Sequence, residues 1–201
     1  YEYNDSMTIM KWVRGSNHRH NTAINAMVDK TFIPIGLSLK VDATYNRDSY
    51  LVSQSSVMVN NHSHNASGTL TTSFQKLSWM RLSAAFTAKY YWERSSIMKL
   101  DVLSSYTTNL SIYLFPTKNM ELKMKFYNLT NEISDGHYHT CSLLDGDFNY
   151  KINNVWELGL SATNLLNSKS YSITQNIGIN TFNTFLPLRG REILLRLQLR
   201  L

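Results

Sequence analysis

All six histidines of this chain occur in His-x-His pairs, a spacing that can bind metal ions. The pairs are His18 with His20, His62 with His64, and His137 with His139. Alternate residues of a β-strand share a face, so each pair could chelate Zn²⁺, Cu²⁺ or a haem iron if a third ligand approached. The alternative is that histidines at a sheet rim only form hydrogen bonds or contact lipid headgroups. No other cofactor is predicted.

The three pairs are not expected to share one face. His137 and His139 continue a set of residues predicted to face the inside of a barrel, whereas His18 and His20 continue the outward set of the strand that follows them. His62 and His64 fall in a predicted loop. This difference in parity weighs against a single shared metal ion.

Charged residues of the alternating segments form a second candidate site. They would hold a plug domain or line a path for a solute, or else be solvated and paired across strands. These residues are Arg81, Lys89, Lys123, Lys125, Asp145, Asp147, Arg196 and Arg200. No Ser, His and acidic residues occur in a nucleophile-elbow or zincin spacing, so the chain is not predicted to be an enzyme.

The composition limits the class of protein. Charged residues make up 17% of the chain, against about 25% in soluble domains, and 12 Tyr, 8 Phe and 4 Trp stand among many Ser, Thr and Asn. The net charge of +6 is scattered, which argues against nucleic acid and allows contact with the phosphates of lipopolysaccharide. No apolar run approaches the roughly 20 residues of a membrane-spanning helix. The single cysteine, Cys141, excludes an internal disulfide.

Period-two alternation predicts the strands that position these residues. It is clearest in residues 37–46, 80–93, 120–126 and 192–201, and weaker in 7–13, 22–32, 66–74, 98–114, 138–150 and 156–162. In the last segment Ile193, Leu195, Leu197, Leu199 and Leu201 share one face. About ten antiparallel strands follow, each near the length of about 9–11 residues that crosses a bilayer.

The connections between these strands alternate in length. Short turns are predicted at Pro34, at 76–78, at 116–119 and at 152–154, and the longest loops at 47–61 and 165–187. Short turns on one rim and long polar loops on the other are typical of outer-membrane barrels, as are aromatic residues at the strand ends. The sequence therefore predicts an all-β membrane protein, an antiparallel transmembrane β-barrel.

From residue 114 onward the chain resembles the C-terminal barrel of TonB-dependent outer-membrane receptors of Bacteroidetes-type bacteria. The resemblance depends on four short sequence motifs: LFPTK (114–118), LDGDFNYK (144–151), WELGLSATNLLN (156–167) and LRGRE (188–192). Its motif residues are Asn164, Leu165, Leu166, Asn167, Arg189, Arg191 and Glu192. Asn side chains there would satisfy backbone groups as the strand turns into a loop. The chain departs from the family at Gly190, often Pro, and at Leu201, usually aromatic.

The resemblance implies a barrel of 22 strands with an N-terminal plug and a segment that contacts TonB, of which residues 1–201 would be less than half. The chain begins at Tyr1 without a leader, so either a signal peptide has been removed or it is a piece of a longer receptor. The implied location is the outer membrane of a Gram-negative bacterium. The implied partners are membrane lipid, lipopolysaccharide, the rest of the receptor with its plug, the TonB complex and a surface lipoprotein.

Two other hypotheses remain open on the sequence. One is a complete small barrel of ten strands that acts as an adhesin, a structural protein or a rim-site hydrolase. The other is a soluble β-sandwich or ligand-binding barrel, in which protein atoms would cover the apolar face. The transported nutrient is not predicted by any of these observations.

Overall fold

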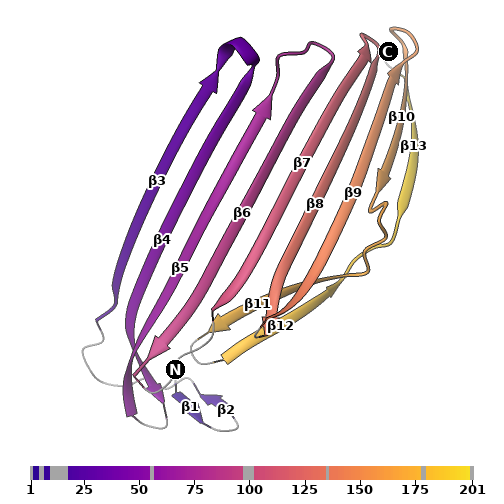
Figure 1. The fold of residues 1–201 in the computed structure, drawn as a ribbon. Coiled ribbons are helices and arrows are strands. Elements are labelled where there is room, and N and C mark those ends of the chain that lie inside the picture. Colours follow the sequence, from indigo (N-terminus) through magenta and orange to yellow (C-terminus); the bar gives the residue numbers. More distant parts are fainter. Residues whose placement is uncertain are drawn as a thin grey trace.

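The computed structural model describes residues 2–4, 7–9, 18–54, 57–96, 102–134, 136–177 and 180–199. Nine antiparallel strands form one curved sheet, in which each strand pairs with the next along the chain and the last returns to pair with β10 (Figure 1). They are β3 (His20–Phe32), β4 (Leu37–Gln54), β5 (Val57–Phe74), β6 (Met80–Ser95), β7 (Leu103–Thr117), β8 (Met120–Ser134), β9 (His137–Lys151), β10 (Trp156–Thr163) and β13 (Glu192–Leu199).

Two small hairpins accompany this sheet. β1 (Glu2–Asn4) pairs with β2 (Met7–Ile9) and, in parallel, with the far end of β4. β11 (Ser170–Ile177) and β12 (Asn180–Pro187) form a separate antiparallel pair. Among the described residues no pairing joins β3 to β13, so the sheet has two open edges and the expected closure into a barrel is not present.

The short turns lie together at one end of the sheet, as predicted. They comprise the 3-10 turn η1 (Ile33–Ile35) and the links β5–β6, β7–β8 and β9–β10 (Figure 1). The first requires a glycine, because Gly36 has φ +66° and a Cβ there would lie 2.6 Å from the Cβ of Lys76. The Gln75 N–H donates to the Gly36 carbonyl at 2.9 Å, which ties the first turn to the second.

The two predicted long loops are wrong. Residues 47–61 are mostly strand, because the β4–β5 pairing continues from Arg47↔His64 to Gln54↔Val57. Their Ser and Asn residues, which are common in loops, are engaged across the ladder here, as where Ser49 Oγ lies 2.7 Å from His62 Nδ1. Residues 165–187 contain the β11–β12 hairpin.

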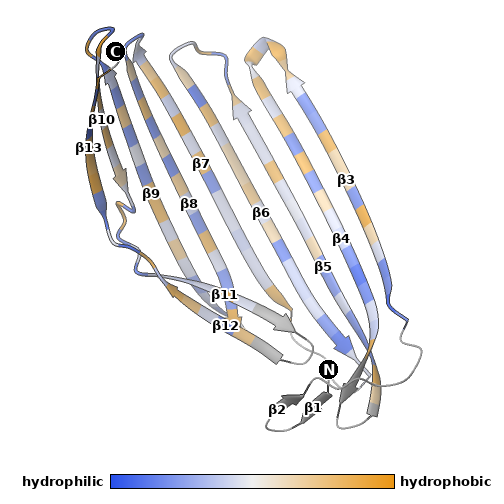
Figure 2. Ribbon diagram, turned by 180° about the vertical axis from the view of Figure 1, so that it is seen from behind, coloured by the Kyte–Doolittle hydropathy of each residue, from blue (hydrophilic) through white to orange (hydrophobic). Residues whose placement is uncertain are grey.

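The two faces of the sheet differ in polarity, because the alternation holds along most of each strand, with exceptions such as Lys30 on the apolar face and Leu194 on the polar face. Register partners share a face, so one row on what we name the apolar face consists of Val28, Val41, Leu70 and Phe86. On the opposite side, the polar face, the neighbouring row consists of Asp42, Thr69, Thr87 and Thr107. Figure 2 shows the alternation as orange and blue segments along the strands.

The burial pattern is inverted relative to a soluble protein. The apolar face is uncovered: Val28 is 68% exposed, Phe86 45% and Leu195 73%. Among the described residues the buried apolar side chains are Val59, Leu129 and Cys141, and the buried polar ones are Asn61, Glu93, Ser104, Asn131, Glu132, Glu157, Asn164 and Ser172. The described elements therefore do not form the β-sandwich considered above.

Candidate functional site: the cavity beneath the β11–β12 hairpin

Asn164 starts the segment that folds back over the sheet. It has a left-handed φ of 49° where β10 ends, and its N–H donates to Asp145 Oδ1 at 2.8 Å. Its side-chain amide donates to the carbonyls of Ser168 (3.0 Å) and Arg189 (2.7 Å), and its Oδ1 accepts from the Ser168 N–H. The Asn164 side chain therefore bonds the backbone on both sides of the β11–β12 hairpin, at Ser168 and at Arg189. Hydrogen bonds from an Asn side chain to the backbone are what the sequence predicted at this turn.

The hairpin lies on the polar face, over β8 and β9. Asn131 donates through Nδ2 to the Ser172 carbonyl, and His139 Nε2 lies 3.4 Å from Ser170 Oγ. The ring of Phe185 meets the His139 ring edge-on at 5.8 Å. These contacts place β11 and β12 across the polar side of the sheet, so the apolar side is left bare.

A cavity of about 510 Å³ lies between β11 and the polar face. Its floor is formed by β5 to β8 and its roof by Tyr171, Ile173 and Thr174. On the floor, Asn65 pairs with Tyr91 and Lys89 with Ser105, so amide, phenol, ammonium and hydroxyl groups lie in adjacent rows. This volume falls in the usual range of small-molecule sites.

The cavity offers hydrogen-bonding groups together with aromatic rings. Tyr91, Tyr127 and Tyr171 line it, and Asn65, Ser105 and Thr107 contribute polar side chains. Thr174 Oγ1 is buried without a hydrogen-bond partner in the described part of the chain. Buried polar atoms are ordinarily satisfied, so this hydroxyl requires a water or a ligand. Lys89 and Glu132 both line the cavity, so its charges are balanced and the arrangement suits a polar solute.

A buried carboxylate fixes the strands next to the cavity. Glu93 Oε1 accepts from the Tyr50 hydroxyl at 2.9 Å and from Asn61 Nδ2, while Oε2 accepts from the Tyr91 hydroxyl at 2.9 Å. Glu93 is only 2% exposed. Its bonds connect β4, β5 and β6 and orient the Tyr91 ring that lines the cavity.

Most of the charged residues predicted for the inner face are engaged within the wall. Lys123 and Asp147 are register partners 3.9 Å apart, and Arg196 donates to Asn149 Oδ1 at 3.1 Å. The Arg81 guanidinium lies 5.3 Å from the Phe115 ring, and Asp145 holds Asn164 as described. These contacts agree with cross-strand pairing in a polar wall.

The other predicted charges differ in position. Lys89 lines the cavity, whereas Lys125 stands opposite Asp145 in the register. Arg200 lies outside the described residues.

The motif residues after Asn164 lie at the turn out of β10. The Leu165 N–H donates to the Leu144 carbonyl at 2.8 Å, Leu166 is exposed, and Asn167 has φ 57°. Arg189 and Glu192 lie 3.8 Å apart, and Arg191 is exposed.

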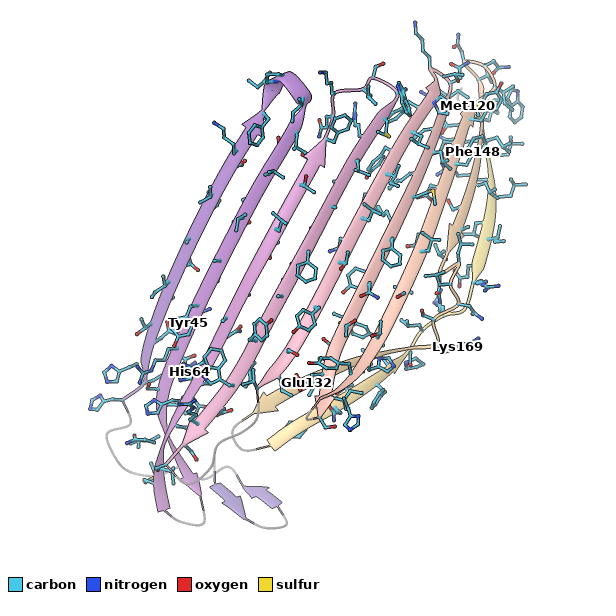
Figure 3. All side chains as sticks on the ribbon, viewed as in Figure 1. Tyr45, His64, Met120, Glu132, Phe148 and Lys169 are labelled. Carbon is cyan, nitrogen blue, oxygen red and sulfur yellow. The ribbon has the colours of Figure 1, made fainter. Side chains whose placement is uncertain are left out.

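The histidines do not converge on one point. His20, His62 and His64 lie on the apolar face near the loop end of β3 and β5, and His139 lies on the polar face beneath the hairpin. Figure 3 labels His64 beside Tyr45. His62 and His64 are strand residues, so the loop predicted for them is wrong. His18 precedes β3 and His137 begins β9. In the described ranges no group of three His, Cys, Asp or Glu side chains could hold a metal ion.

At the loop end, beyond the last apolar row, hydrogen bonds, burial and nearby charges lower the pKa values of Asp48 and His64. Hydrogen bonds from Arg19 and Asn21 lower the pKa of Asp48, whose carboxylate contacts Arg19 at 3.1 Å. Burial, with repulsion from Arg47, His62 and Arg94, lowers the pKa of His64.

The cavity itself was not predicted from the sequence. Period two places Tyr91, Tyr127 and Asn131 on the polar face, but their types are common on any strand. The missing information was the position of β11, which depends on contacts between residues about 40 positions apart, such as Asn131 with Ser172.

No helix in the described ranges is long and apolar enough to span a membrane. Comparison with protein-family models, curated proteins and solved structures gave no match for this chain.

Proposed function

We propose that this chain is part of the barrel wall of a TonB-dependent outer-membrane receptor that takes up a nutrient. The observation that carries the proposal is the inverted burial: the apolar face is bare and the polar face carries the hairpin and the cavity. A wall between lipid and a wet interior has this polarity, whereas a soluble sheet packs its apolar face inward.

The height of the apolar face supports the membrane assignment. On β6 it extends from Met80 at the turn end to Tyr90. At about 3.4 Å per residue this is about 34 Å of strand, or about 26 Å along the normal at a tilt of about 40°. An apolar band about 25 Å tall is characteristic of outer-membrane barrels. The polar exceptions include Lys30, near the turn end of β3, and the pair Asn128 and Ser142, which satisfy one another at 2.8 Å.

The open edges favour a wall segment over a complete small barrel. β3 and β13 each present an edge that is unpaired among the described residues, and such edges are covered or paired in stable proteins. In the lipid core an unpaired backbone edge is especially unfavourable. Further strands of a larger receptor would satisfy both edges.

In this function the chain supplies the wall and a solute-contacting surface, and no catalysis. The short turns face the periplasm, and the β11–β12 hairpin enters the barrel from the outer side. A solute would contact Lys89 and the surrounding tyrosines of the cavity on its way to the plug. Energy from TonB would act on the plug, while the hydrogen-bonded wall stays rigid.

Site-specific labelling tests the membrane orientation. In a Cys141→Ala background, Phe86→Cys on the apolar face and Thr87→Cys on the polar face are compared in bilayers. A fluorophore at position 86 should be quenched by brominated lipid tails, and one at 87 by a water-soluble quencher. Quenching of both by the aqueous reagent alone would contradict the proposal.

The reading frame that precedes Tyr1 distinguishes the receptor from the small barrel. Several hundred preceding codons with a plug domain support the receptor. A signal peptide directly before Tyr1 would exclude it and leave the small barrel.

A further inference from the structure

Five cationic or ionisable side chains gather on the apolar face just beyond its last apolar row. We name this group the basic rim; it consists of His20, Arg47, His62, His64 and Arg94. The pairings His62↔Arg94 and Arg47↔His64 place its members in two adjacent rows across β3 to β6. The preceding row contains Tyr45 and Tyr90, so the rim begins where the apolar surface ends.

Among the described residues the acid nearest to the basic rim on its own face is Glu132, in the row of Tyr90, and its carboxylate is already engaged by the Ser104 hydroxyl and the Gly136 N–H. The two nearest acids, Asp48 and Glu93, point to the polar face and are already engaged by Arg19 and by Tyr50, Asn61 and Tyr91. In the described part of the chain, Arg47 and Arg94 are exposed and lack a carboxylate within ion-pair distance. Two guanidinium groups are therefore available to an external anion.

Part of the basic rim also lines a cavity. A cavity of about 400 Å³ lies over its β3–β5 part and is lined by Arg47, Ser49 and His62, with His18 and His20 at its side. Ser49 Oγ fixes the His62 ring at 2.7 Å, and the Tyr45 hydroxyl fixes His64 at 2.7 Å. The His64 ring also stacks on Trp92, with centroids 5.0 Å apart. These contacts hold hydrogen-bond donors in place before any ligand arrives.

We propose that the basic rim binds the phosphate groups of an outer-leaflet glycolipid, the lipid A part of lipopolysaccharide; this proposal rests on the membrane orientation given above. Headgroup phosphates lie directly outside the hydrocarbon, at the height of the rim. A guanidinium pairs with phosphate through two parallel N–H···O bonds, which suits Arg47 and Arg94. The outer leaflet follows from position, because the rim lies at the end opposite the short turns.

The test compares two double variants of the intact natural polypeptide in detergent micelles. Arg47→Gln with Arg94→Gln removes the rim cations, and Lys40→Gln with Lys118→Gln removes the same charge elsewhere. Native mass spectrometry titrates each with bisphosphorylated lipid A and with dephosphorylated lipid A. The arginine variant should bind bisphosphorylated lipid A about ten-fold more weakly, and the lysine variant should match the wild type.

Three results would overturn the site. They are equal affinity of the arginine variant and wild type, equal binding of the two lipids by wild type, or displacement of lipid A by millimolar inorganic phosphate, which would indicate a site for free phosphate. Quenching of a fluorophore at position 86 by brominated lipid tails is measured on the same double variants in bilayers. Loss of phosphate discrimination with normal quenching contradicts only this site, whereas absence of quenching contradicts the membrane function itself.

Discussion

At the residue scale, Asn164 has the most specific role in the described structure. Its left-handed backbone allows the turn out of β10, and its amide bonds both ends of the returning segment. The sequence predicted this use of Asn because the chemistry is local. It could not predict that Arg189, 25 positions away, would be one of the partners.

Substitution of Asn164 separates its two contributions. Asn164→Ala removes the side-chain hydrogen bonds and leaves a strained φ, so the free energy of unfolding should fall by about 2–3 kcal/mol. Asn164→Gly removes the bonds without the strain and should cost about 1 kcal/mol less. Urea unfolding in lipid vesicles measures both. Equal losses would show that the backbone conformation is not strained.

The Arg19–Asp48 pair predicts a local response to acid. The folded pKa of Asp48 is lowered, so the stabilisation is present above the ordinary aspartate value of about 3.8 and is lost as pH falls through the lower folded pKa. Amide hydrogen exchange near Asn21 should therefore accelerate below about pH 4 after correction for the intrinsic pH dependence. In Asp48→Asn the same amides should exchange faster at neutral pH and lose this acid step. An acid step that survives in the variant would assign it to another group.

At the element scale, the hairpin is the part of the fold that the sequence predicted least well. The short turns were predicted because turn-forming residues such as Pro34 act on their immediate neighbours. The β11–β12 segment is rich in Asn, Ser and Thr and was assigned to a loop for that reason. Its position depends on tertiary contacts such as His139 with Phe185, which no local pattern encodes.

Docking of the hairpin predicts the reactivity of Cys141. This thiol is buried on the polar face beside His139, which contacts the hairpin, and is only 2% exposed. A water-soluble maleimide should therefore label it slowly in the folded protein. Removing both anchors with Asn131→Ala and His139→Ala should raise the labelling rate by about ten-fold or more, because each lost hydrogen bond destabilises docking by about 1 kcal/mol.

The control for this experiment leaves the hairpin contacts intact. Thr69→Ala removes a polar-face hydroxyl that bonds Thr87, at a distance from the described hairpin contacts. Labelling of Cys141 should stay at the wild-type rate in this variant. Rapid labelling of the wild type would show that the hairpin does not cover the thiol.

At the scale of the whole molecule, the polarity of the sheet was predicted correctly and its closure was not observed. Period two assigns every strand residue to a face without knowledge of its partners, so the apolar and polar sets could be predicted from Leu37 to Leu199. Closure depends on which strands meet at the edges of β3 and β13, and the described residues do not pair those edges. The alternation therefore indicates which face each strand residue lies on, whereas closure depends on what pairs with the two open edges.

The proposed membrane orientation predicts an asymmetric response to charge on adjacent residues of β10. Leu160 lies on the apolar face and is 41% exposed, while Ser161 faces the other way and is the register partner of Asp147. In a bilayer, Leu160→Arg should lower the free energy of unfolding by about 2–4 kcal/mol, the cost of an arginine near the midplane. Ser161→Arg should change it little, because Asp147 and water can solvate the new charge. Folding titrations in vesicles measure both variants, and equal tolerance of the two would show that hydrocarbon does not contact the apolar face.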